Sequence, residues 1–99
     1  MSVLVTMRVS GDVAKFRTTL DSEPDRFRSI ADAAKAAGAI HHRFGVGDDF
    51  VVIVDEWQTA EAFQTFFQTP EIAQIMADSG AQGEPEITVT EAISSPDQF

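Results

Sequence analysis

A run of five apolar residues near the middle of the chain constrains the fold more than any other feature. The run, FVVIV, occupies positions 50–54 of the 99-residue sequence. Successive side chains of a β-strand point to opposite faces of its sheet, so a strand that is apolar at every position is covered on both faces. The sequence therefore predicts a central strand over residues 50–57.

Alternation of apolar and polar residues predicts three more strands. They span residues 2–9, 39–45 and 87–92, and each has one apolar face. The glycine-containing stretch 46–49 predicts a tight turn that joins residues 39–45 to the central strand as a β-hairpin. We therefore expect a sheet of four strands.

The first helical region is predicted to be broken. Apolar residues at helical spacing predict a short helix over residues 13–20 and a second helix over residues 27–34 that ends at Gly38. Between them, Ser22 precedes a first turn that contains proline, as in a capping box. We therefore expect Ser22 to cap the second helix after a break near residues 21–23.

The second helical region shows a similar interruption. Thr59 is a predicted N-cap, and the dipeptide Thr69-Pro70 is predicted to restart the helix, which should end near Gly80. The helix that follows Thr59 carries three phenylalanines, Phe63, Phe66 and Phe67. Residues 81–85 are expected to form a loop.

The predicted order is strand, helix, strand, strand, helix, strand. Right-handed crossovers close this order into an α+β, ferredoxin-like βαββαβ fold, with one antiparallel sheet and the helices on one face. The chain supplies nothing to cover the second apolar face of the central strand, so we expect a homodimer in which another copy covers it. A single domain over residues 1–99 is expected, with a polar tail (94–99) that is mobile or contacts a partner.

Composition restricts the partners. The net charge is -9, which opposes binding to nucleic acid or to an anionic membrane. All basic residues lie between Arg8 and Arg43, whereas residues 48–99 carry only acidic charges, so the two halves should attract each other. The absence of cysteine excludes disulfides and thiolate metal sites. The start of the chain lacks the features of a secretory signal, so we expect a cytoplasmic protein.

The stretch FVVIVDEWQTAEAFQTFF, preceded by AGAIHHRF, resembles the antibiotic biosynthesis monooxygenase-like family. Members typically have an acidic residue two positions before a tryptophan at the end of the third strand, followed by a helix that opens with an Ala-Phe pair. Asp55, Trp57, Ala62 and Phe63 occupy these places. The motif covers about residues 38–70 of this chain, and the shared architecture covers most of it.

The resemblance implies a dimeric α/β barrel with a pocket between sheet and helices in each subunit. Some members oxidise aromatic polyketides without metal or flavin, so it implies a cofactor-independent monooxygenase-like enzyme for a small aromatic or polyketide-like substrate. Active members use Asn and often Tyr, and this sequence contains neither. A non-catalytic module that binds a small ligand or a partner is therefore an alternative, and haem binding, known in other members, is a further one.

His42 and Asp55 are the candidate catalytic residues. With the hairpin paired at positions 45 and 50, His42 lies beside Ile53 and shares a face with Asp55. His42 is then a general base that Asp55 orients. The alternatives are a buried or interface histidine, and an ion pair of Asp55 with Arg8 or Arg43.

Four further residues are candidates for contact with a substrate. Trp57 is either a platform for the substrate or a core anchor, and Phe63 and Phe67 either line a pocket or bury their helix. His41 faces solvent, a dimer interface or the pocket. Because adjacent histidines on a strand point to opposite faces, they do not share a metal ion easily, and neither a metal site nor a cofactor is expected.

Overall fold

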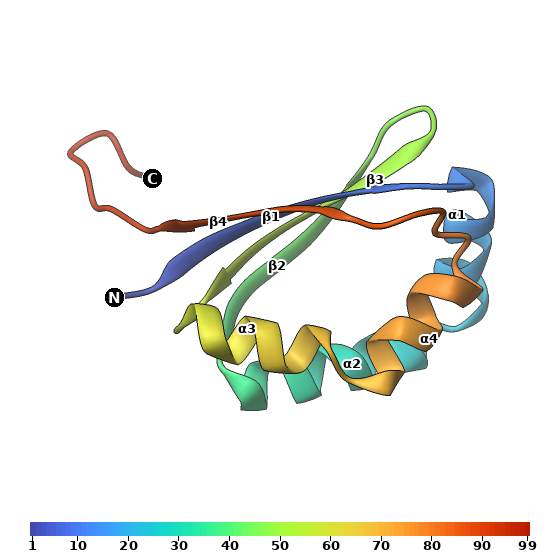
Figure 1. The fold of residues 1–99 in the computed structure, drawn as a ribbon, viewed down its shortest axis with the longest axis horizontal. Coiled ribbons are helices and arrows are strands. Elements are labelled where there is room, and N and C mark those ends of the chain that lie inside the picture. Colours follow the sequence, from blue (N-terminus) through green and yellow to red (C-terminus); the bar gives the residue numbers. More distant parts are fainter.

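The sheet is antiparallel and has four strands, with every helix on one of its faces (Figure 1). The computed structural model describes residues 1–99. The strand order is β2-β3-β1-β4, so β3 lies inside the sheet as its apolar run requires. The predicted ferredoxin-like α+β fold is therefore confirmed. The strands are β1 (Val3–Ser10), β2 (Ala39–Val46), β3 (Phe50–Trp57) and β4 (Glu86–Glu91).

Each crossover consists of two short helices. Proline begins the second helix of each pair, where its missing N–H removes no helical hydrogen bond. Both predicted breaks are therefore confirmed. None of the helices has the length and apolar character needed to cross a lipid bilayer. The helices are α1 (Val13–Ser22), α2 (Pro24–Ala37), α3 (Ala60–Phe67) and α4 (Pro70–Asp78).

The predicted cap at Ser22 is wrong, whereas the predicted cap at Thr59 is confirmed. Ser22 ends α1, and its hydroxyl donates to the Thr18 carbonyl at 2.7 Å instead of capping α2. Serine has this local alternative whenever a helix reaches it, so the same sequence pattern fits both outcomes. The Thr59 side chain accepts a hydrogen bond from the Ala62 amide at 3.0 Å and begins α3.

The β2–β3 hairpin pairs two residues away from the predicted register. His42 lies opposite Asp55 rather than Ile53. Because side chains alternate with a period of two, a shift of two keeps the residues from His41 to Gly45 on their predicted faces. His42 and Asp55 therefore share a face as expected, and they become direct neighbours.

The register differs because the turn is tighter than expected. The amide of Gly47 donates to the Phe50 carbonyl at 2.9 Å, which leaves Asp48 and Asp49 as the turn. Two-residue turns are the commonest hairpin connections because their twist matches that of the strands. At the other end of β2, a register shift between Ala39 and His41 breaks the regular alternation.

The buried core is small. Only 11 of the 99 residues are buried, and none of them lies on α2. The side chains of β1 that point toward the helices form the centre of the core together with two aromatic residues. The helices therefore do not fill the space beneath the sheet. The core cluster is Val5, Met7, Val9, Trp57 and Phe63.

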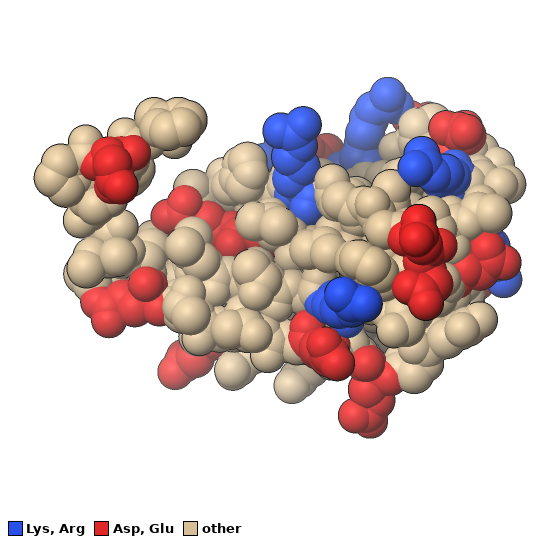
Figure 2. All heavy atoms as spheres, turned by 90° about the horizontal axis from the view of Figure 1, so that it is seen from above, with Lys and Arg blue, Asp and Glu red and all other residues tan.

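The opposite face of the sheet carries no helix. Figure 2 looks onto this face, and uncharged side chains cover most of its centre. Leu4 on β1 and Val54 on β3 are 42% and 45% exposed. The guanidinium of Arg8 lies on the same side, 3.7 Å above the Phe50 ring, a favourable cation–π contact. The apolar second face expected from the sequence is thus present and exposed in the single chain.

A close backbone contact joins the two crossover segments. Gly11, after β1, forms a β-bridge with Ala81, after α4. The amide of Asp12 also donates to the Gly80 carbonyl at 3.1 Å. A Cβ atom on Gly11 would collide with this carbonyl oxygen, so only glycine allows the two segments to approach this closely.

Replacement of this glycine should destabilise the protein. We expect Gly11→Ala to lower the free energy of unfolding by about 1–3 kcal/mol, because a backbone carbonyl cannot rotate away from the added methyl group. Urea unfolding measures the change. Gly45→Ala is the control, since no atom lies within 4 Å of a Cβ there. Equal unfolding midpoints for the two variants would contradict the close contact.

Candidate functional site

A cavity of about 540 Å³ lies between the sheet and the helices. Strands β1, β2 and β3 form one wall, and side chains from all four helices form the other. Of its 31 lining residues, 21 are hydrophobic. Pockets for small organic molecules typically have about 300–1,000 Å³ and a mainly apolar lining. The cavity therefore has the size and character of a small-molecule site.

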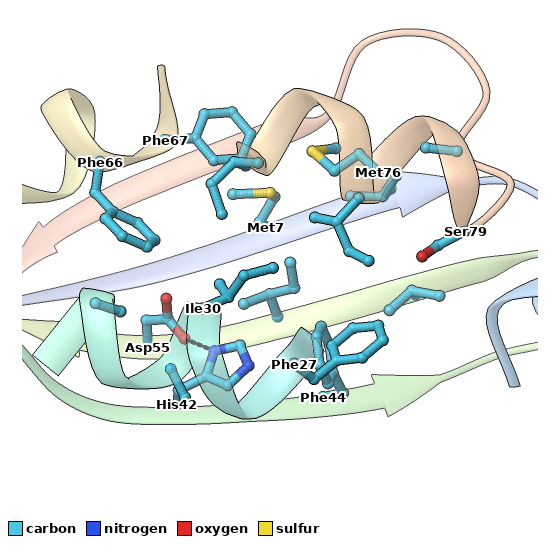
Figure 3. Close-up of a pocket in the computed structure, with 18 of the residues that line it drawn as sticks. Met7, Phe27, Ile30, His42, Phe44, Asp55, Phe66, Phe67, Met76 and Ser79 are labelled. Atoms are coloured by element: carbon cyan, nitrogen blue, oxygen red, sulfur yellow. Dashed lines mark hydrogen bonds and ion pairs between the residues drawn. The ribbon is translucent and has the colours of Figure 1, made fainter. Parts of the chain in front are cut away.

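The main polar feature of the cavity wall is a hydrogen-bonded group of three side chains. His42 Nδ1 lies 2.6 Å from Asp55 Oδ1 (Figure 3). The other carboxylate oxygen of Asp55 accepts a hydrogen bond from Trp57 Nε1 at 3.0 Å. Asp55 is only 7% exposed. One buried carboxylate thus holds both an imidazole and an indole, and all three residues line the cavity.

Strand alternation brings the three residues together. Asp55 and Trp57 are two positions apart on β3, so their side chains lie on the same face of the sheet. His42 is directly opposite Asp55 on β2. Arg8 and Arg43 pair with the outward-facing Val52 and Val54, so the alternative ion pair with Asp55 is wrong because both arginines lie on the other face.

The hydrogen bonds determine which nitrogen of His42 is free. An ionised carboxylate only accepts hydrogen bonds, so Nδ1 of His42 carries the hydrogen. The lone pair of neutral His42 is then on Nε2, which makes no hydrogen bond within the chain. The side chain is 43% exposed and borders the cavity (Figure 3). This arrangement can accept a proton from a bound molecule and stabilise the resulting imidazolium.

Aromatic rings form two clusters along the cavity. The first surrounds Trp57, whose ring centroid is 5.8 Å from that of Phe63 and 5.5 Å from that of Phe66. Phe67 stacks on Phe63 at 5.6 Å. Trp57 is 2% exposed, so it is a core anchor that also borders the cavity. The predicted contact residues Phe63 and Phe67 both line the cavity.

The second aromatic cluster was not anticipated. Phe44, on the same face of β2 as His42, lies 4.7 Å from the imidazole between ring centroids. Phe16 of α1 and Phe27 of α2 contact Phe44 at centroid distances of 5.0 and 6.2 Å. The sequence shows only that each is apolar on its own element. Their meeting depends on how the helices pack on the sheet.

His41 has a different environment from His42. It is opposite Glu56 and is exposed. It borders the cavity beside the irregular end of β2. Its contact with a substrate stays a prediction. No three His, Cys, Asp or Glu side chains come close enough together to hold a metal ion.

An ion pair connects the helices on the far side of the cavity from the sheet. Arg26 of α2 lies 2.9 Å from Asp78 at the end of α4. A hydrogen bond from Gln74, and next the one from Arg26, lower the pKa of Asp78 below its usual value. The carboxylate therefore stays ionised down to more acidic pH, and the connection between α2 and α4 persists with it.

Together, the fold and the cavity define a ferredoxin-like α+β protein with a His–Asp pair at the wall of an apolar cavity. No protein-family model and no curated protein matches the sequence. Solved structures do match. SnoaB, a cofactor-independent oxygenase from Streptomyces nogalater, is 15% identical with a TM-score of 0.66, and the match covers 98% of each chain.

Two further structures show the same likeness. The protein Rv0793 from Mycobacterium tuberculosis is 13% identical with a TM-score of 0.64, over 98% of this chain and 100% of that chain. An antibiotic biosynthesis monooxygenase is 10% identical with a TM-score of 0.64, over 93% and 99%. Identities this low establish the fold alone. The chain has the fold of the antibiotic biosynthesis monooxygenase-like proteins, as the sequence resemblance implied.

The hydrogen bond to Asp55 should be visible in the tautomer of His42. In long-range proton–nitrogen NMR spectra, we expect neutral His42 to carry its hydrogen on Nδ1, because Asp55 accepts it there. His41 serves as a control in the same spectrum and is expected to carry its hydrogen on Nε2. The variant Asp55→Ala should make the two histidines alike. Identical tautomers in the unaltered protein would contradict the pairing.

Proposed function

We propose that the protein is a cofactor-independent oxygenase for a small aromatic or polyketide-like compound. The observation that carries the proposal is the free Nε2 atom of His42 at the wall of an apolar cavity, with Asp55 bound to the opposite nitrogen. A general base needs a free lone pair and a fixed orientation, and this pair supplies both. SnoaB, which has the same fold, is a cofactor-independent oxygenase, and this supports the reaction class.

In this reaction His42 removes a proton from an activated methylene carbon of the substrate. The carboxylate of Asp55 stabilises the imidazolium that forms. The carbanion reduces dioxygen, and one oxygen atom remains on carbon as a carbonyl group while the other leaves as water. One CH₂ group and one O₂ molecule thus become one C=O group and one H₂O molecule. The apolar walls exclude bulk water from the reactive carbanion.

The aromatic walls suit a planar substrate. Rings from both clusters border the cavity, and aromatic pairs favour offset or edge-to-face contacts. A flat ring system can therefore contact Phe44 near His42 and Phe66 near Trp57. Such contacts hold the acidic carbon near Nε2, which converts an encounter in solution into a reaction within a complex.

Removal of the base should abolish most of the activity. Anthrone, a tricyclic ketone with an acidic methylene group, is the probe, and oxygen uptake is the measurement. We expect His42→Ala to lower kcat about 10²- to 10⁴-fold, the usual contribution of a general base. The dissociation constant, measured without oxygen by quenching of Trp57 fluorescence, should change little.

The controls separate a lost base from a damaged fold. Asp48→Asn removes an exposed carboxylate in the hairpin turn and should leave oxygen uptake unchanged. Asp55→Asn removes the charge that stabilises the imidazolium and should lower kcat while the cavity persists. Turnover of anthrone by His42→Ala at the rate of the unaltered protein would refute the role of His42.

A non-catalytic small-molecule carrier is the second candidate. The feature that favours it is the absence of Asn and Tyr from the whole chain, because donors of these types stabilise developing negative charge in many enzymes. The same experiment distinguishes the two functions. Tight binding of anthrone without oxygen uptake by the unaltered protein would favour the carrier.

We also propose that two copies associate through the sheet face that carries no helix. Leu4 and Val54 are exposed on this face, and an apolar sheet face is stable in water when a second layer covers it. Arg43 at the β2 edge and Glu86 at the β4 edge flank it. A twofold axis through the face can bring the basic edge of one copy near the acidic edge of the other.

A charge placed on this face should separate the copies. We expect Val54→Lys to shift the mass measured by light scattering from dimer to monomer, because a buried unpaired ammonium is costly. Val46→Lys is the control, since Val46 is similarly exposed at 40% but pairs with Val51 on the helix-bearing side. An unaltered protein that is monomeric at micromolar concentration would exclude the dimer.

A further inference from the structure

A single buried hydroxyl group in the cavity lacks a hydrogen-bond partner. Ser79 follows α4 directly and is only 9% exposed. Its Oγ is the one buried side-chain nitrogen or oxygen atom that makes no hydrogen bond. Ser79 lines the cavity, and Figure 3 shows its oxygen pointing into it. A buried polar group without a partner costs folding free energy, so it calls for a reason.

Other hydroxyl groups near helix ends are satisfied locally. Thr18, Thr19 and Ser22 of α1 each donate to the carbonyl four residues earlier, at 3.0, 2.9 and 2.7 Å. The corresponding acceptor for Ser79 is the Ile75 carbonyl, which takes the Ser79 amide at 2.9 Å. The Ser79 hydroxyl does not use this carbonyl. Both its donor and its acceptor capacity are therefore unused within the chain.

The backbone around Ser79 is held in place from several sides. The Ala81 amide donates to the Met76 carbonyl at 3.0 Å, and the Gln82 amide donates to the Ser10 carbonyl at 2.8 Å. Asp78, the preceding residue, is paired with Arg26 of α2. The backbone that carries the hydroxyl is thus fixed before any ligand arrives, which favours selective recognition of a polar group.

Ser79 lies apart from the His42–Asp55 pair within the same cavity. The pair projects from β2 and β3, whereas Ser79 follows α4, and Figure 3 shows them at different ends of the lining. The apolar side chains of Phe44 and Met76 lie along the lining between them. Ser79 is therefore a polar point of the cavity that is separate from the His42–Asp55 pair.

We propose that Ser79 is a specificity-determining residue that binds a ring hydroxyl group of the substrate, remote from the carbon that His42 deprotonates. The inference deepens the proposed function and rests on it for the position of the reacting carbon. It assigns the substrate to aromatic compounds that carry a hydroxyl group on a ring away from the activated methylene group. An aromatic hydrocarbon of the same shape would leave the buried hydroxyl unpaired, and discrimination of this kind is strong when a site is built to hydrogen-bond a polar group.

The test compares anthrone with its ring-hydroxylated derivatives in binding experiments without oxygen. Quenching of Trp57 fluorescence gives the dissociation constants. For the unaltered protein we expect at least one hydroxylated anthrone to bind about tenfold more tightly than anthrone, the effect of one well-placed hydrogen bond. In Ser79→Ala this gain should vanish, while the affinity for anthrone itself stays the same.

Two variants exclude a merely structural role. Ser79→Ala removes an unpaired hydroxyl, so its melting temperature should equal or exceed that of the unaltered protein. Ser29→Ala, at an exposed position on α2, should retain the full preference for the hydroxylated compound. A preference for the hydroxylated anthrones that survives in Ser79→Ala would overturn the proposal. This result is expected if Ser79 binds only an ordered water molecule. Equal affinities of all the anthrones for the unaltered protein would also overturn it.

The outcome is separable from that of the proposed oxygenase function. Because affinities are measured without oxygen, they do not depend on turnover. A Ser79-dependent preference in a protein that consumes no oxygen would leave the recognition intact and refute only the catalysis. Oxygen uptake that depends on His42, together with affinities that show no Ser79-dependent preference, would support the catalysis and refute only the recognition by Ser79.

Discussion

The buried carboxylate of Asp55 is the interaction on which the candidate site depends. A charge removed from water is costly unless hydrogen bonds satisfy it, and here His42 and Trp57 provide them. The same two bonds orient the imidazole and the indole. They also favour the observed hairpin register, because a shift of one residue between β2 and β3 would place His42 on the face opposite to that of Asp55. One group therefore connects the pairing of the sheet with the chemistry of the cavity.

The space beneath the sheet explains why so little of the chain is buried. None of the residues of α2 is buried, and many apolar residues line a cavity instead of a packed core. Protein interiors are normally close-packed, so an apolar hollow of this size forfeits packing energy. A bound molecule would restore these contacts. The aromatic walls and the unpaired Ser79 hydroxyl are the features that we propose to make this cavity selective.

Much of the fold was predictable because local rules act over short stretches. The apolar run of β3 requires an inner strand, and Pro24 and Pro70 interrupt the crossovers where proline is tolerated. The errors arose where one pattern fits two structures. Ser22 can cap one helix or bond back within another, and Gly47 fits either a wider or a tighter turn. Both errors shift a boundary or a register without changing the topology.

The candidate site was likewise predictable only where local rules apply. Alternation along β2 and β3 places His42 with Asp55 and Trp57 whatever the exact register, provided the shift is even. The second aromatic cluster joins residues from β2, α1 and α2. The periodicity of the sequence does not predict these contacts, because they depend on the angle and the distance at which the helices pack on the sheet.

The sequence by itself determined which strands form, that β3 lies inside the sheet, and which side chains share each strand face, because these follow from periodicity along the chain. Only the tertiary structure decided that a cavity remains beneath the sheet, that Asp55 bonds His42 rather than an arginine, and that Ser79 points inward without a partner. Contacts of this kind join residues far apart in the chain, and their geometry is set by the packing of whole elements.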